Sequence, residues 1–269
     1  MNAAQMYEAY LTPAWSEPSR REREFLEAGE PLTLTTPYGR VQGRRWPVLV
    51  EGRGTVLLMH GWAGRSATWL VLTPLLNAVG YHVVAFDAPG QGETRGPDGP
   101  TRSHFFTFAA TLLAAQGEIL RTEEDSFAAV VGHSLGASAI PYAMMKGLRA
   151  ARAVLLAPTA RTASYLVRWA ASQGLTPEEE VSVEREWFAE FGPGVLDETD
   201  PVLLAREMTA SALVVHDEGD VEAPIADGRE LAAAWPEAIF EPTTGLGHRR
   251  LLLSRAAMGR IVEFVSGGS

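Results

Sequence analysis

The chain has 269 residues and 46% of them are hydrophobic, which is enough for one large domain with a sizeable core and disfavours a disordered chain. The formal net charge is −10 and no cluster of Lys or Arg offsets it, so binding to nucleic acid or to anionic lipid is not expected. Cysteine is absent, which excludes disulfides and thiolate metal sites.

The N-terminal part of the chain differs in pattern from the rest. Its first stretch, MNAAQMYEAYLTPAW, has neither the basic start nor the apolar run of a secretory signal, and no part of the chain approaches 18 consecutive apolar residues. We therefore expect a cytoplasmic protein without a membrane span. Residues 1–30 carry a helix-like segment rich in Arg and Glu, which we expect on the outside of the molecule. Residues 32–46 read as two strands around the turn Pro37–Gly39, an antiparallel edge.

Further along the chain, short apolar runs alternate with helical segments. Strands are expected at Thr55–Met59, Tyr81–Phe86, Phe127–Val131, Ala153–Leu156, Ala212–Val215 and, more weakly, Ile239–Phe240. Helices are expected at Ser66–Ala78, Ser103–Arg121, Ser134–Gly147, Pro224–Trp235 and Arg249–Val265. This alternation predicts an α/β fold, with a mostly parallel, doubly wound sheet and helices on both faces.

One region interrupts the alternation, because no strand pattern is found between Pro158 and Pro201. Thr176–Glu179 is a good helix start, with a capping Thr, a Pro at the first position and acids in the first turn. We predict that residues 159–200 form a helical lid over the carboxyl ends of the strands. Residues 1–158 and 201–269 would then form the core.

A candidate nucleophile lies where a strand pattern meets a helix pattern. The segment Gly132–His133–Ser134–Leu135–Gly136 matches the G-x-S-x-G nucleophile elbow, in which a tight turn holds the Ser hydroxyl above the sheet. The two Gly residues remove side chains that would clash in such a turn. The alternative is an ordinary strand-to-helix turn without chemistry.

A Ser hydroxyl becomes a nucleophile only when a base takes its proton, so the sequence should supply a His and an acid. Among the six His residues we favour His248, which lies in a Gly-rich loop before the last helix; a His exposed to solvent at a helix start is the alternative. For the acid we favour Asp220, in the turn that follows the strand ALVV. Asp217 and Glu222 are the alternatives in the same run of carboxylates.

At this point the chain resembles the α/β-hydrolase superfamily, over residues 33 to 265. His60–Gly64 (HGWAG) is similar to the loop that forms half of the oxyanion hole, and Asp87–Gly92 (DAPGQG) resembles the D-x-P-G-x-G turn. Gly132–Gly136 is the elbow, and the order Ser134, Asp220, His248 is the family order of nucleophile, acid and histidine. The resemblance implies a Ser-His-Asp catalytic triad.

The resemblance also implies roles for further residues. The backbone N–H groups of Trp62 and Leu135 would form the oxyanion hole, and His60 would support that loop without being catalytic. No metal or organic cofactor would be needed. Trp62 and Trp69 either line the pocket or fill the core.

Aromatic residues gather in the predicted lid. Tyr165 and Trp169, and likewise Trp187 and Phe191, are four residues apart, so each pair shares a helix face. These side chains either pack the lid onto the core or face a substrate pocket; as pocket candidates we select Tyr165, Trp169 and Trp187.

The resulting prediction is a serine hydrolase that cleaves small or medium carboxylic esters. A carbon–carbon bond hydrolase or a perhydrolase could use the same triad, and a non-catalytic ligand-binding protein could use the same fold. Enzymes of this fold with an Asp nucleophile are disfavoured because position 134 is Ser. The sequence leaves the natural substrate and the oligomeric state open.

Overall fold

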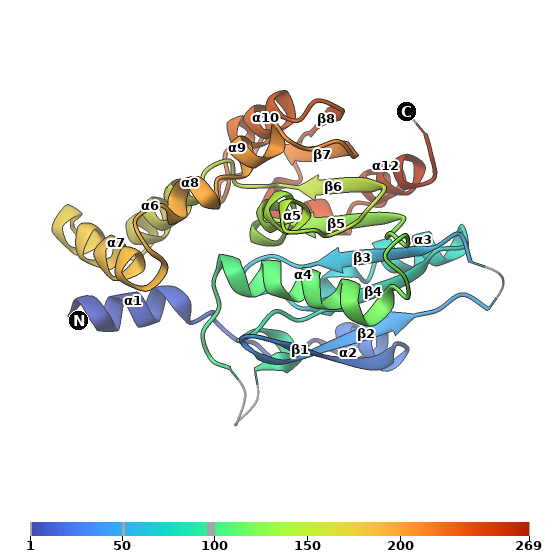
Figure 1. The fold of residues 1–269 in the computed structure, drawn as a ribbon, viewed down its shortest axis with the longest axis horizontal. Helices are drawn as coiled ribbons and strands as arrows, with labels where there is room; N and C mark the ends of the chain where they lie inside the picture. The colour runs from blue at the N-terminus through green and yellow to red at the C-terminus, as the bar shows by residue number, and fades with distance from the viewer. Residues whose placement is uncertain (1, 50–51, 96–99, 269) are drawn as a thin grey trace.

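The computed structural model describes residues 2–49, 52–95 and 100–268, and an eight-stranded sheet runs through its centre (Figure 1). The strand order is β1-β2-β4-β3-β5-β6-β7-β8. The strands are β1 (Glu30–Thr36), β2 (Gly39–Trp46), β3 (Thr55–Met59), β4 (His82–Phe86), β5 (Ala129–His133), β6 (Arg152–Leu156), β7 (Ser211–Asp217) and β8 (Ala238–Thr243). The β1–β2 and β2–β4 pairs are antiparallel, and all others are parallel. The predicted fold class is confirmed.

Helices cover both faces of the sheet because the strand side chains alternate between two cores. In β3, Leu57 and Met59 belong to one core and Val56 and Leu58 to the other, as the two-residue period of a strand requires. The first core is closed by α4 (Phe105–Ile119), α5 (Leu135–Met145), α9 (Pro201–Ala205) and α10 (Ile225–Ala234). The second is closed by α3 (Leu72–Ala78) and α12 (Arg255–Val265).

Two helices that the sequence predicts as continuous are interrupted. The predicted helix Ser66–Ala78 is a 3₁₀ turn, η1 (Ser66–Trp69), followed by α3, and the Ser66 hydroxyl is held at 2.6 Å from Asp87 Oδ1. The predicted helix Arg249–Val265 is split into α11 (Gly247–Arg250), the turn η3 (Leu251–Leu253) and α12. Ser254 caps α12 by accepting a hydrogen bond from the Ala257 N–H at 3.3 Å, so the chain restarts as a helix there.

The region after β6 is helical, as the sequence predicts, with α6 (Thr162–Ser172), α7 (Pro177–Phe191) and α8 (Val195–Glu198). Thr176 and Glu179 form a capping box at the start of α7, and Pro177 occupies its first position. Figure 1 shows these helices beyond the carboxyl ends of the central strands. Among the described residues, no helix has the length and apolar character needed to cross a membrane.

The N-terminal segment differs from the expectation of a helix on the outside. It forms two helices, α1 (Ala3–Leu11) and α2 (Arg20–Glu27), and α1 lies beside α7 (Figure 1). Helix α1 buries Met6, Tyr7, Tyr10 and Leu11 in a small core that it shares with α6 and α7. We call α1, α6 and α7 together the cap.

Polar contacts fix α1 and the segment after it in place. The Tyr7 hydroxyl donates to Glu190 at 2.9 Å, and Arg102 pairs with the same carboxylate at 2.6 Å. Beyond α1, Arg95 donates to the Pro13 carbonyl at 2.8 Å, and the Arg65 guanidinium donates to the Ser16 carbonyl. Residues 2–16 are therefore attached both to α7 and to the core.

Candidate active site

Ser134 lies at the turn between β5 and α5, in a backbone conformation that residues other than glycine rarely adopt. Its φ is 52° and its ψ is −122°, a strained combination that costs of the order of 1–3 kcal/mol. Both ends of the turn are fixed, because the Ser134 N–H donates to the Leu156 carbonyl at 2.8 Å and the Ser138 N–H donates to the Ser134 carbonyl at 2.9 Å. Packing on both sides thus maintains the strained turn.

The glycines that flank Ser134 are required by close packing. A Cβ at Gly136 would lie 2.2 Å from the His60 carbonyl oxygen, and a Cβ at Gly132 would lie 2.6 Å from the Ala137 backbone. Neither position has room for a side chain. The sequence argument from the two Gly residues therefore has a direct steric basis.

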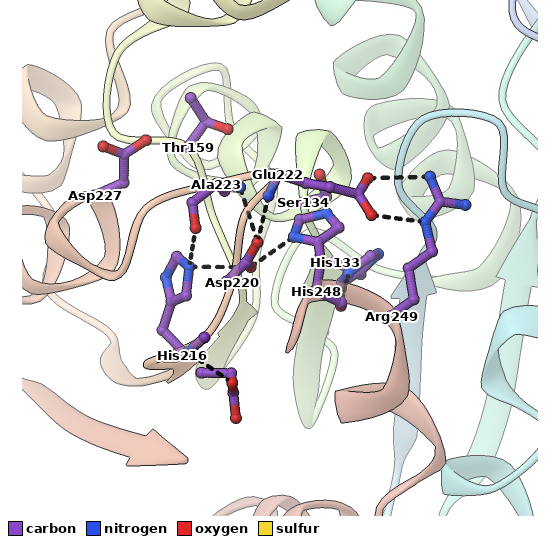
Figure 2. A network of polar contacts seen from close by, with 12 residues as sticks. His133, Ser134, Thr159, His216, Asp220, Glu222, Ala223, Asp227, His248 and Arg249 are labelled. Atoms are coloured by element: carbon purple, nitrogen blue, oxygen red, sulfur yellow. Dashed lines mark hydrogen bonds and ion pairs between the residues drawn. The ribbon is translucent and has the colours of Figure 1, made fainter. Parts of the chain in front are cut away.

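His248 and Asp220 form a close contact beside this turn (Figure 2). His248 Nδ1 lies 2.7 Å from Asp220 Oδ2, and both side chains are buried. The other oxygen, Asp220 Oδ1, accepts the Glu222 and Ala223 N–H groups, each at 2.9 Å. Burial acts to raise the pKa of Asp220, but hydrogen bonds from His216, His248 and Ala223 hold it well below its ordinary value. Asp220 is thus an anion that orients His248.

His216 is a second histidine next to Asp220. Its Nε2 donates to the Ala223 carbonyl at 2.9 Å and lies 3.3 Å from Asp220 Oδ2. The His216 side chain is fully buried, on the side of the carboxylate away from His248 (Figure 2). His216 therefore fixes the loop that carries Asp220, through its contacts with Ala223 and Asp220.

The two alternative acids have other partners. Asp217 Oδ2 accepts hydrogen bonds from the Thr243 hydroxyl at 2.8 Å and from the Leu246 N–H at 2.9 Å, which ties β7 to the loop before His248. Although burial opposes it, bonds from backbone N–H groups lower the pKa of Asp217. Glu222 is paired with the Arg249 guanidinium at 2.9 and 3.1 Å. Among the described residues, neither the Asp217 nor the Glu222 carboxylate forms a hydrogen bond with an imidazole.

The loop after β3 passes close to the start of α5, since a Cβ added at Gly61 would lie 2.9 Å from Ser134 Cβ. His60 Nε2 accepts the Ala88 N–H at 3.0 Å, so its Nδ1 carries the proton and donates to the Gly61 carbonyl at 2.7 Å. Burial lowers the pKa of His60, which keeps this ring neutral. Leu135 is the first residue of α5, where a helix N–H has no intrahelical acceptor. Among the described residues, neither the Trp62 nor the Leu135 N–H donates to a protein acceptor.

Comparison with known proteins places the chain in a family. The model of the alpha/beta hydrolase family matches residues 56–260. The chain belongs to this family. A "serine hydrolase-like protein" from Danio rerio is 32% identical to this chain over 110 residues, which are 40% of this chain. That stretch spans 31% of the length of the Danio relative.

Solved structures resemble this chain over most of its length. A thermophilic esterase from Thermogutta terrifontis is 16% identical, with a TM-score of 0.65 over 88% of this chain and 98% of that one. An esterase from a Rhodococcus species is 19% identical, with a TM-score of 0.65 over 89% and 99% of the two chains. At these identities the likeness shows the common fold.

Two cavities meet at the candidate site of this chain. An open cleft of about 640 Å³ is lined by Ser134 and His248 together with residues of the cap and of the loop after β3. A second cavity of about 20 Å³ lies between Leu135 on α5 and the cap. Trp62, Thr159 and Tyr165 line both, so the two spaces share a wall.

The predicted pocket residues are all near these cavities. Tyr165 lines both cavities, Trp169 lines the open cleft and Trp187 lines the small cavity. The same rings also pack against one another within the cap. Lining a cavity and packing the cap are therefore compatible roles for these aromatic residues. Of the two central tryptophans, Trp62 lines both cavities, whereas Trp69 is buried in the second core.

Three residues near the site lacked a clear signal in the sequence. His133 Nε2 donates to the His248 carbonyl at 3.0 Å, and the two rings lie 4.7 Å apart. Burial, with the nearby His248, lowers the pKa of His133 to about 3, so it is neutral. Tyr10 of α1 and His104 at the start of α4 line the small cavity. All three reach the site through tertiary packing.

Within residues 2–49, 52–95 and 100–268, no group of three or more His, Asp and Glu side chains is arranged to hold a metal ion.

Proposed function

We propose that this hydrolase is a serine esterase that cleaves small or medium carboxylic esters through Ser134, His248 and Asp220. One observation carries the proposal: His248 is held at 2.7 Å by a buried, ionised Asp220 in the cleft that Ser134 enters from a strained turn. A charged acid, an imidazole and a hydroxyl that lines the cleft from a rigid turn are what acyl transfer to serine requires. The Danio relative, whose name is "serine hydrolase-like protein", supports the same class.

The first half of the proposed reaction acylates the enzyme. Ser134 Oγ attacks the carbonyl carbon of the ester while His248 Nε2 takes the hydroxyl proton. Asp220 stays ionised and accepts a hydrogen bond from the Nδ1–H of His248, which fixes the tautomer and stabilises the imidazolium that forms. The imidazolium then protonates the leaving alkoxide, so the alcohol departs and an acyl-Ser134 ester remains.

The charge that develops on the carbonyl oxygen requires donors. The N–H groups of Trp62 and Leu135 have no acceptor among the described residues, and both belong to segments that line the cleft or the small cavity. In our proposal they bind the oxyanion, and each contributes about 10²–10³ in rate. Water, activated by His248, then hydrolyses the acyl-enzyme.

Labelling with a fluorophosphonate probe tests the nucleophile. The wild-type protein should react at Ser134 and Ser134→Ala should not, as read by intact mass. Ser172→Ala is a matched control, because Ser172 lines the same cleft but bonds the Trp169 carbonyl, and it should label like wild type. Equal labelling of Ser134→Ala and wild type would rule out Ser134 as the nucleophile.

Turnover of p-nitrophenyl esters tests the reaction class. We expect hydrolysis by the wild type and a loss of kcat of at least about 10³-fold in Ser134→Ala. Labelling at Ser134 without turnover of any ester would instead favour carbon–carbon bond hydrolysis or perhydrolysis. Absence of both labelling and turnover would favour a ligand-binding protein.

A further inference from the structure

The small cavity beside Leu135 is closed by the N-terminal helix. Tyr10 and Leu11 of α1 line it opposite Leu135, and Tyr165 and Trp187 complete the cap side. The Tyr10 ring packs edge-on against Trp169, Trp187 and Tyr165, with centroid distances of 5.0, 5.8 and 6.3 Å. It is 6% exposed, so its ring fills space that would otherwise be open beneath the cap.

Two hydroxyl groups of the lining residues are turned to other partners, whereas His104 Nδ1 and Trp187 Nε1 are buried without a hydrogen-bond partner among the described residues. The Ser138 hydroxyl donates to the Thr159 carbonyl at 3.1 Å, and the Ser103 hydroxyl accepts from Gln91 at 2.8 Å. The remaining lining is mainly aromatic and aliphatic. Such a mainly apolar space suits a short alkyl chain better than a charged group.

The position of His248 decides which half of an ester enters this cavity. His248 must protonate the leaving oxygen, so the alcohol portion lies on the His248 side, in the open cleft. The acyl chain points away from His248. The small cavity is lined by Leu135, whose N–H we place in the oxyanion hole, and His248 is not among its lining residues. It therefore receives the acyl chain.

We propose that Tyr10 is a specificity-determining residue that limits this hydrolase to short acyl groups, by closing the acyl cavity from the N-terminal helix. The inference rests on the proposed esterase function. The free space of about 20 Å³ is little more than the roughly 10–15 Å³ that one water requires on the same measure. An acetyl or propionyl chain fits there, and a hexanoyl chain does not unless Tyr10 is shortened.

The test compares kcat/KM for p-nitrophenyl acetate and hexanoate. In the wild type we expect acetate to exceed hexanoate at least tenfold. Tyr10→Ala should raise the hexanoate-to-acetate ratio at least tenfold, and Tyr10→Phe, which keeps the ring, should leave it within twofold. If Tyr10→Ala does not fold, Tyr10→Leu provides the same comparison.

Tyr7→Ala is the matched control for loosening of α1. Tyr7 is a buried tyrosine of the same helix that contacts Glu190 and is not among the residues that line the cavity. It should leave the ratio within twofold. An unchanged ratio in the Tyr10 variants, or an equal rise in Tyr7→Ala, would overturn the proposal.

A second readout separates this inference from the esterase function itself. Phosphonylation of Ser134 by p-nitrophenyl methyl- and hexylphosphonates, followed by intact mass, requires no turnover. If the wild type is phosphonylated, the same change in chain-length ratio is expected in Tyr10→Ala, and its absence refutes the role of Tyr10. If neither esters nor phosphonates react with the wild type, the esterase function and this inference both fail.

Discussion

At the scale of single residues, two carboxylates three positions apart have separate tasks. Asp217 accepts backbone and hydroxyl hydrogen bonds and so fixes the loop that carries His248, whereas Asp220 contacts the His248 imidazole itself. The division follows from position. Asp217 is the last residue of β7 and faces the neighbouring strand end, and Asp220 lies at the far side of the turn.

Asparagine substitutions distinguish these tasks. Asp220→Asn should lower kcat by about 10⁴-fold, because the amide cannot hold the imidazole in the required tautomer or stabilise its charge. Asp217→Asn should retain most of the activity but lower the free energy of unfolding by about 1–3 kcal/mol, since a buried acceptor is lost. Ester kinetics and urea unfolding measure the two effects. A larger loss of kcat in Asp217→Asn than in Asp220→Asn would contradict this assignment.

At the scale of elements, the elbow joins β5 to α5 against the oxyanion loop. The helix can approach the loop only because position 136 carries no side chain, and a Cβ there would overlap the His60 carbonyl oxygen. A contact with backbone cannot relax as the end of a flexible side chain can.

A pair of Gly→Ala variants tests this packing. Gly136→Ala should destabilise the fold by at least about 3 kcal/mol and abolish activity, because overpacking moves the oxyanion loop. Gly117→Ala is the control: Gly117 lies exposed in α4 with no atom within 4 Å of an added Cβ, and this change should stabilise by about 0.5–1 kcal/mol. Thermal unfolding and ester turnover report both. Wild-type activity in Gly136→Ala would show that the loop adapts.

An element could be predicted from the sequence when the interactions that form it involve residues close together in the chain. The strands and the start of α7 could be predicted because apolar runs and the capping residues around Thr176 act within a few positions. Ser134, Asp220 and His248 could be selected because each follows a strand and has the required chemistry. The separate turn at Ser66–Trp69 goes with a contact between Ser66 and the distant Asp87, which no local pattern encodes. The burial of Tyr10 and His133 is likewise a tertiary effect that no local pattern encodes.

At the scale of the whole molecule, several buried histidines make stability depend on pH. Burial lowers the pKa of His60, of His104 to about 4 and of His133 to about 3, while in the unfolded chain each has a pKa near 6.5. Between pH 6.5 and about 4 the unfolded state therefore binds more protons, and the stability falls as the pH is lowered.

Urea unfolding at pH 7.5 and pH 4.5 measures this dependence. His104 and His133 should each contribute a loss of about 2–3 kcal/mol at pH 4.5, two pH units below the unfolded pKa at ~1.4 kcal/mol per unit. His104→Phe should reduce the difference between the two pH values by about that amount, because His104 packs among Tyr38, Phe106 and Phe191 and a phenyl ring fits there. An equal pH difference in this variant and the wild type would refute the role of His104.

The attachment of the cap restricts how a ligand can reach the small cavity. The chain passes between cap and core three times: after α1 toward β1 and β2 at one edge of the sheet, and at both ends of residues 159–200 beside β6 and β7 near the other edge (Figure 1). A body held near opposite edges cannot swing open about a single hinge. Tyr165 lines both the open cleft and the small cavity, so its ring stands on the wall between the space open to solvent and the space beneath the cap.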